Sequence, residues 1–164
     1  MAGAGRSAGF SLVEILISVI LVGLSIAALV AANSSFTMAN SAGADLSTAE
    51  FLVEQIRELT TMLPVADPDT TVWTTLGPEE ASLALYDDVD DFDNATFSPP
   101  ISAGRMALND FAAFTQQVTV EKVNPSDFDQ VWADGALSSF VRVTVTVSRN
   151  SGQISSASWI RAQL

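Results

Sequence analysis

Residues 10–32 read FSLVEILISVILVGLSIAALVAA, and this apolar stretch decides how the rest of the chain is arranged. Its length matches the roughly 20 residues that cross the hydrocarbon core of a bilayer as a helix. A secretory signal peptide has a shorter apolar region, of about 7–15 residues, that ends in a small-residue cleavage site. Here Ala31 and Ala32 would supply the small residues, but the apolar run is too long. We therefore expect a membrane-spanning helix.

Glu14 is the only ionisable side chain between Phe10 and Ala32. An acidic residue at the centre of a membrane costs about 2.5–3.5 kcal/mol, so a plain signal anchor would not carry one. A carboxylate within such a segment is by default functional and needs a partner. Glu14 therefore predicts a specific interaction.

The composition excludes several classes of function. The chain has 164 residues with 19 acidic and 7 basic side chains, for a net charge of −12. Nucleic-acid binding is not expected, because it needs clustered Lys and Arg. The chain has no His and no Cys, which removes imidazole and thiol catalysis, disulfides and the usual zinc ligands. It also lacks a Gly-rich phosphate loop. We expect no enzymatic activity and no catalytic residues.

The sequence GFSLVE at residues 9–14 resembles the N-terminal signature of type IV prepilins. In that family a prepilin peptidase cuts after the glycine and N-methylates the new first residue. The resemblance implies that residues 1–9 are a leader peptide, that Gly9 is its last residue and that Phe10 becomes the N-terminus. It also implies that Glu14 pairs with the N-terminal amine of a neighbouring subunit. Pairing two charges in an apolar medium recovers part of their desolvation cost, and it can fix the register between chains.

The resemblance further implies a location and partners. The chain would cross the inner (cytoplasmic) membrane once, with its C-terminal domain outside the cytoplasm, as the positive-inside rule predicts from Arg6. Its partners would be the prepilin peptidase and other pilins or pseudopilins. Two features depart from the family pattern: Ser7 and Ala8 separate Arg6 from Gly9, and Ala31 stands where major pilins often carry proline. The second favours a minor pilin or pseudopilin of a type IV pilus, a type II secretion system or a competence-like filament.

A second helical pattern follows the apolar stretch. Residues 33–63 contain no proline, and Pro64 ends the pattern. Apolar side chains recur there at steps of three and four; they are Ala49, Leu52, Val53, Ile56, Leu59 and Leu63. We expect one helix from about residue 10 to about residue 62. Residues 10–32 would form its transmembrane and assembly half, and residues 33–63 an amphipathic continuation. Asn40–Gly43 is a weak stretch that could kink or locally melt it.

We expect residues 64–164 to form an exported globular domain. In its last part apolar and polar residues alternate, which indicates half-buried strands. The expected strands are Phe114 through Val123, Phe140–Val147 and a return strand Ile154–Ile160, with a turn at Arg149–Gly152 before the last one. An antiparallel sheet of three or more strands would rest on the amphipathic half of the helix, in an α+β, pilin-like fold. A short strand near Thr70–Leu76 and a short helix from Pro78 to Leu85 are also expected.

The most unusual stretch is YDDVDDFDN at residues 86–94, which contains Asp87, Asp88, Asp90, Asp91 and Asp93. Three interpretations stay open. The loop could be a solvated surface turn with Val89 and Phe92 in the core. It could be a calcium site, because hard cations prefer clustered carboxylates, although the EF-hand pattern is missing; some secretion pseudopilins bind calcium in loops. It could also contact basic residues of a neighbouring subunit.

The alternative to a filament subunit is a membrane-tethered domain that binds a ligand or calcium and never polymerises. The N-terminus of the mature protein distinguishes the two. A filament subunit would begin at N-methylated Phe10, whereas the alternative would keep Met1 or be cut after Ala31 or Ala32.

Overall fold

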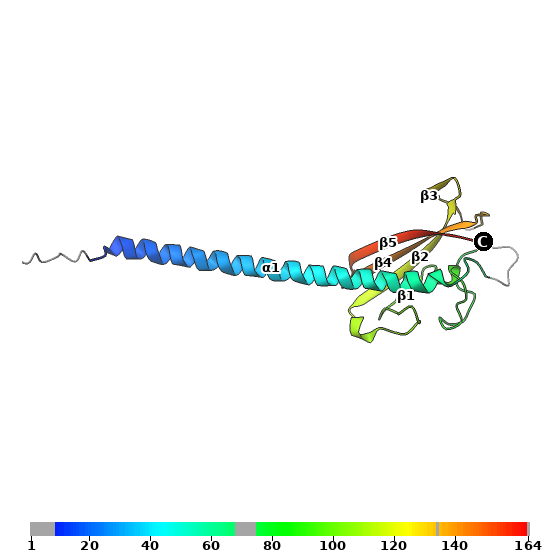
Figure 1. The fold of residues 1–164 in the computed structure, drawn as a ribbon, viewed down its shortest axis with the longest axis horizontal. Helices are drawn as coiled ribbons and strands as arrows, with labels where there is room; N and C mark the ends of the chain where they lie inside the picture. Colours follow the sequence, from blue (N-terminus) through cyan, green and yellow to red (C-terminus); the bar gives the residue numbers. More distant parts are fainter. Residues whose placement is uncertain (1–8, 68–74, 134, 164) are drawn as a thin grey trace, which may run out of the picture. The chain divides into compact units, whose positions relative to one another are not determined.

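The structure is a computed structural model that describes residues 9–67, 75–133 and 135–163. It contains one long helix and a five-stranded antiparallel sheet, so the predicted α+β fold is confirmed (Figure 1). Its elements are α1 (Leu12–Thr61), the short 3-10 helices η1 (Asp90–Phe92) and η2 (Asn109–Phe111), and the strands β1 (Thr96–Phe97), β2 (Phe114–Asn124), β3 (Asp127–Val131), β4 (Phe140–Arg149) and β5 (Gly152–Ala162). The chain divides into two units, Met1–Gly43 and Ala44–Leu164, with the boundary inside α1.

The first unit consists of the N-terminal part of α1. This helix is long and apolar enough to cross a membrane. From Leu12 to Ala32 it rises about 30 Å, which is about the thickness of a bilayer's hydrocarbon core. The hydroxyls of Ser18 and Ser25 donate to the carbonyl oxygens of Glu14 and Leu21, at 2.8 Å each, so these polar groups are satisfied within the helix. Asn40–Gly43, predicted as a weak stretch, is helical.

The sheet of the second unit has the strand order β1-β2-β4-β5, and β3 pairs with the end of β2. The predicted alternation along β4 is confirmed, because its inward side chains are all buried; they are Val141, Val143, Val145 and Val147. The predicted turn is also present. Asn150 and Ser151 have φ values of 50° and 66°, as a two-residue type I′ hairpin requires. The return strand β5 pairs along the whole length of β4.

The core lies between the sheet and the part of α1 that belongs to the same unit. The predicted helix face is confirmed for its buried members; they are Ala49, Leu52, Val53, Ile56 and Leu59. These side chains belong to one apolar cluster with the inward valines of β2 and β4. Fully burying an aliphatic side chain contributes about 1.5–3 kcal/mol, so this layer stabilises the unit without any disulfide.

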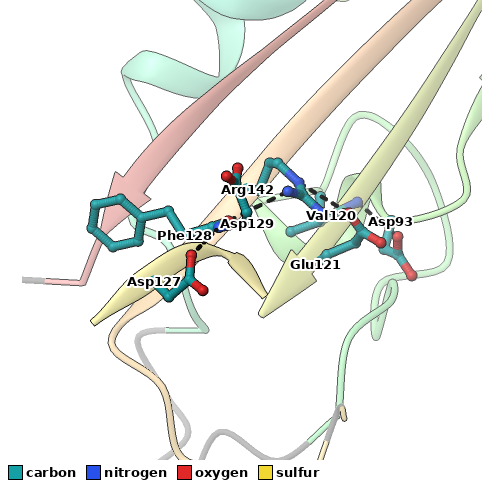
Figure 2. A network of polar contacts seen from close by, with 7 residues as sticks. All are labelled: Asp93, Val120, Glu121, Asp127, Phe128, Asp129 and Arg142. Carbon is teal, nitrogen blue, oxygen red and sulfur yellow. Dashed lines mark hydrogen bonds and ion pairs between the residues drawn. The ribbon is translucent and has the colours of Figure 1, made fainter. Parts of the chain in front are cut away.

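A network of polar contacts holds β3 against the sheet (Figure 2). Arg142 on β4 donates from Nε and Nη2 to Glu121 Oε2, at 3.2 Å and 2.8 Å, and from Nη1 to the carbonyl oxygen of Phe128, at 3.3 Å. Within β3 the backbone N–H of Asp129 donates to Asp127 Oδ1 at 3.2 Å. One arginine thus connects β2, β3 and β4.

The segment between α1 and the sheet differs from the expectation. Pro78–Leu85 forms bends and one hydrogen-bonded turn, closed by Leu85 N–H on Ser82 O at 2.9 Å, so the predicted helix is wrong. Glu79 and Glu80 instead lie beside the aspartates of the acidic loop, and this tertiary contact replaces the helix. Most of the predicted strand Thr70–Leu76 lies outside the described residues, and β1 and β3 were not predicted.

Candidate functional site

The predicted processing residues lie at the start of α1. Ser11 caps the helix, because its Oγ accepts a hydrogen bond from the Glu14 backbone N–H at 3.2 Å. The spacing of Ser11 and Glu14 is that of a capping box, in which the glutamate side chain would bond back to the backbone of the cap residue. Among the residues that the structure describes, none donates a hydrogen bond to the Glu14 carboxylate. Its charge is therefore available to a partner.

Two apolar side chains anchor the acidic loop. Val89 and Phe92 are fully buried, so this part of the surface-turn interpretation is confirmed. Val89 is the N-cap of the 3-10 helix η1 and Phe92 is its last residue, and side chains three residues apart in such a helix lie on the same face. The Val89 N–H donates to the carbonyl oxygen of Pro64 at 3.0 Å, and the Phe92 ring packs edge-on against Tyr86, with the ring centroids 5.2 Å apart. The turn is therefore fixed to the segment just after α1 and to the core.

Because Val89 and Phe92 are anchored in the core, the aspartate before Val89 and the two aspartates between Val89 and Phe92 are buried as well. Asp88 is 1% exposed, and Asp90 and Asp91 are 0% exposed. The interpretation of the loop as a solvated turn is therefore wrong for these three residues. Asp87 stays exposed. Asp93 is half-buried, and its Oδ1 accepts a hydrogen bond of 2.8 Å from the Val120 N–H on β2 (Figure 2).

Asp91 is the centre of the buried cluster. Its Oδ2 accepts backbone hydrogen bonds from Asp87 at 2.9 Å and Asp88 at 3.4 Å, while its own N–H donates to Asp88 Oδ1 at 3.1 Å. Its second oxygen, Oδ1, is sealed from solvent and has no hydrogen-bond partner among the described residues. Oε2 of Glu80 is also sealed from solvent and has no hydrogen-bond partner among the described residues. A buried polar oxygen without a partner normally costs about 1–3 kcal/mol.

Glu79 and Glu80 complete the cluster. One carboxylate oxygen from each of Glu79, Glu80 and Asp91 lies within 4.8 Å of the other two, and the same holds for Asp87, Asp88 and Asp91 and for Glu79, Asp88 and Asp90. Asp93 belongs to none of these groups. Sequence reasoning missed the two glutamates, because only the folding of the preceding loop brings them to the aspartates. The local signal available was their position shortly before the acidic loop.

Crowding and burial shift the protonation of the cluster. The hydrogen bond that a proton on Glu80 would make with the Asp91 carboxylate, followed by burial and repulsion from Asp91, raises the pKa of Glu80 to about 7. Burial, followed by a side-chain hydrogen bond with Asp90, raises the pKa of Asp88 to about 8. Burial also raises the pKa of Glu79. The cluster therefore holds protons near neutral pH unless another positive charge replaces them.

The chemistry of the cluster is that of a hard-cation ligand set. Its side chains are all carboxylates, and the chain contains no His and no Cys that could act beside them. Carboxylate oxygens are preferred by calcium and magnesium. No protein-family model, no curated protein and no solved structure matches this chain.

Proposed function

We propose that this chain is a structural subunit, a minor pilin or pseudopilin, of a type IV pilin-like filament. A prepilin peptidase would cut after Gly9 and methylate Phe10, and the chain would then assemble through α1. The single observation that carries the proposal is Glu14, one carboxylate in an otherwise apolar helix start whose charge no described residue neutralises. Its position relative to Gly9 and Phe10 is that of the prepilin signature.

The exposed surface of the first unit supports assembly. The large apolar side chains of α1 from Leu12 to Val30 are more than half exposed, and Phe10 is 79% exposed. A surface of this kind needs either lipid or other apolar helices around it. Before assembly the membrane would cover it, and in a filament the helices of neighbouring subunits would.

The pairing of Glu14 supplies the geometry of assembly. Cleavage after Gly9 would create a positive amine on Phe10, about one helical turn before Glu14. An unpaired charge in an apolar medium is costly, so an amine of one subunit beside Glu14 of the next stabilises only the correct axial stagger. The location follows from the same proposal: a single-pass inner-membrane protein with its second unit outside the cytoplasm.

Two substitutions separate a charge-pairing role of Glu14 from a helix-capping role. Glutamine can still cap the helix but has no charge, whereas alanine can do neither. We expect Glu14→Gln and Glu14→Ala to be processed but to lose assembly equally. The measurement is in-cell photo-crosslinking from a photoreactive residue placed at Val19, an exposed position of the helix.

Crosslinks between unsubstituted chains should contain a second copy or another chain with the same kind of N-terminal helix. Both Glu14 variants should lose these adducts. If Glu14→Gln kept the adducts and only Glu14→Ala lost them, Glu14 would be a helix cap and the pairing proposal would fail. A chain that is anchored but never forms such adducts would instead be the non-polymerising, ligand-binding alternative.

A further inference from the structure

We propose that Glu79, Glu80 and Asp91 bind a calcium ion that joins the loop after α1 to the 3-10 turn η1. This site is independent of the proposed assembly role, because it lies entirely within the second unit. It would act as a cross-link in a chain that contains no cysteine and so cannot form a disulfide.

The distances fit one cation. Calcium binds oxygen ligands at about 2.3–2.6 Å, so two oxygens on the same ion lie at most about 5 Å apart. One oxygen from each of the three carboxylates lies within 4.8 Å of the other two. The three side chains come from two separate loop segments, so an ion between them would hold these segments together.

A second observation, independent of the clustering, points to a ligand. Asp91 is 0% exposed, yet no N–H or hydroxyl group of a described residue donates to its Oδ1 or to Oε2 of Glu80. A hydrogen bond between the two carboxyls themselves requires a proton on one of them. Buried oxygens of this kind are rarely left without a partner. Their common requirement is a positive charge, since two carboxylates cannot donate to each other unless one carries a proton.

Other sources of positive charge are poor fits. In the described ranges, the ion pairs of Arg57, Arg142 and Arg149 are made with Glu54, Glu121 and Asp45, which all lie outside the cluster. Arg105 and Arg161 donate to backbone carbonyl oxygens. A basic side chain from a neighbouring subunit could meet the exposed Asp87 and Glu79, but it could not reach the sealed oxygen of Asp91. Two competitors remain. One is a proton shared by Glu80 and Asp91, which a bound cation would displace, and the other is Lys122 of β2, which is fully buried in the same unit.

The ligand type favours calcium over other cations. All the available side-chain ligands are carboxylates, which excludes the nitrogen and sulfur donors that zinc and copper prefer. Calcium accepts irregular sets of six to eight oxygens, completed by carbonyl groups and water, whereas magnesium requires near-ideal octahedral geometry. Three crowded carboxylates on irregular backbone suit the more tolerant ion.

The test is a CaCl₂ titration of the full chain in non-ionic detergent micelles, after removal of metals with a chelator and at constant ionic strength. Binding heat and the thermal unfolding midpoint would be recorded up to about 10 mM, above the 10⁻⁴–10⁻³ M range of extracellular calcium modules. We expect saturable binding of one ion and a rise in Tm of roughly 5 °C or more at 10 mM CaCl₂, about ten times a millimolar Kd.

Three variants identify the site. Glu79→Gln/Glu80→Gln keeps the shape of both partly exposed side chains and should weaken calcium binding by more than about tenfold. Loss of a residue that only orients a metal ligand already lowers metal affinity by about tenfold or more. Asp91→Asn should do the same while keeping an oxygen for the backbone bonds. Asp110→Asn, an exposed carboxylate outside the cluster, should bind like the unsubstituted chain.

Three results would overturn the calcium site. The first is no heat and no change in Tm at 10 mM CaCl₂, a concentration that covers the roughly millimolar Kd of weak sites. The second is an unchanged Kd in Glu79→Gln/Glu80→Gln, a variant that should fold because both residues reach solvent. The third is an equal response to MgCl₂, which would indicate general charge screening.

Discussion

The side-chain amide of Gln116 on β2 donates a hydrogen bond of 2.8 Å to the carbonyl oxygen of Leu52 in α1. Gln116 is fully buried, and it also bonds both backbone groups of Ile101: Oε1 accepts from Ile101 N–H at 2.7 Å, and Nε2 donates to Ile101 O at 3.2 Å. One polar side chain in the core thus joins the helix, the sheet and the segment that precedes β2.

Replacing Gln116 with leucine should destabilise the second unit. Leucine fills a similar volume but leaves the Ile101 N–H buried without its acceptor, which costs about 1–3 kcal/mol. Urea unfolding of the full chain in micelles, followed by tryptophan fluorescence, measures the loss. Gln117→Leu, at the neighbouring exposed position, is the matched control and should stay within about 0.5 kcal/mol. Equal unfolding midpoints for the two variants would contradict a role for the Gln116 network.

Arg142→Lys should loosen β3. Lysine lacks the planar fork that contacts Glu121 and the Phe128 carbonyl together (Figure 2). Because the two side chains of the ion pair are 23% and 33% exposed, we expect a loss of only about 0.5–1 kcal/mol. Hydrogen exchange of the β3 amides measures this loss, and we expect faster exchange in Arg142→Lys. A double-mutant cycle with Glu121→Gln should show coupling that shrinks in high salt; zero coupling would contradict the predicted role of the pair.

Stability should depend on pH when a chelator removes divalent cations. The pKa of Asp88 is about 8 in the folded chain and about 3.8 when unperturbed. Between these values the folded state keeps a proton that the unfolded state releases, so the folded state binds more protons. The free energy of unfolding should therefore fall as pH rises from about 4 to about 8. Urea midpoints across this range measure the slope.

Asp88→Asn is the control for this pH dependence. Asparagine cannot titrate, but its oxygen can still accept the hydrogen bond from the Asp91 N–H. We expect a flatter profile in this variant, and the slope that remains should come from Glu79 and Glu80, whose pKa values are also raised. A profile that rises with pH in the unsubstituted chain would contradict the buried, protonated state of Asp88.

Periodic stretches were predictable from the sequence, because their burial follows one rule along the chain. The repeat from Ala49 to Leu59 and the alternation along Phe140–Val147 each place apolar residues on one face, and the structure buries these faces together. The turn at Asn150 and Ser151 was predictable for a local reason, since these residues follow one strand pattern and precede the next.

The remaining elements depend on contacts between distant segments. The strand β3 is exposed along its length and rich in acidic residues, so it carries no strand pattern of its own. The local sequence around Asp91 predicts a solvent-exposed side chain, but Asp91 is buried because Val89 and Phe92 are both anchored in the core. Glu79 and Glu80 resembled the start of a helix, and their contact with Asp91 arises only in the folded chain.

The mature N-terminus tests the filament-subunit proposal most directly. A Cβ placed on Gly9 or on Gly23 would meet no atom within 4 Å, so neither Gly9→Ala nor Gly23→Ala should disturb the fold. Intact-mass and peptide analysis of the chain purified from membranes of its own host should find N-methylated Phe10 in the unsubstituted protein and in Gly23→Ala, and an uncut leader in Gly9→Ala. A mature chain that begins at Met1 or Ala2, or that is cut after Ala31 or Ala32, would contradict the proposal.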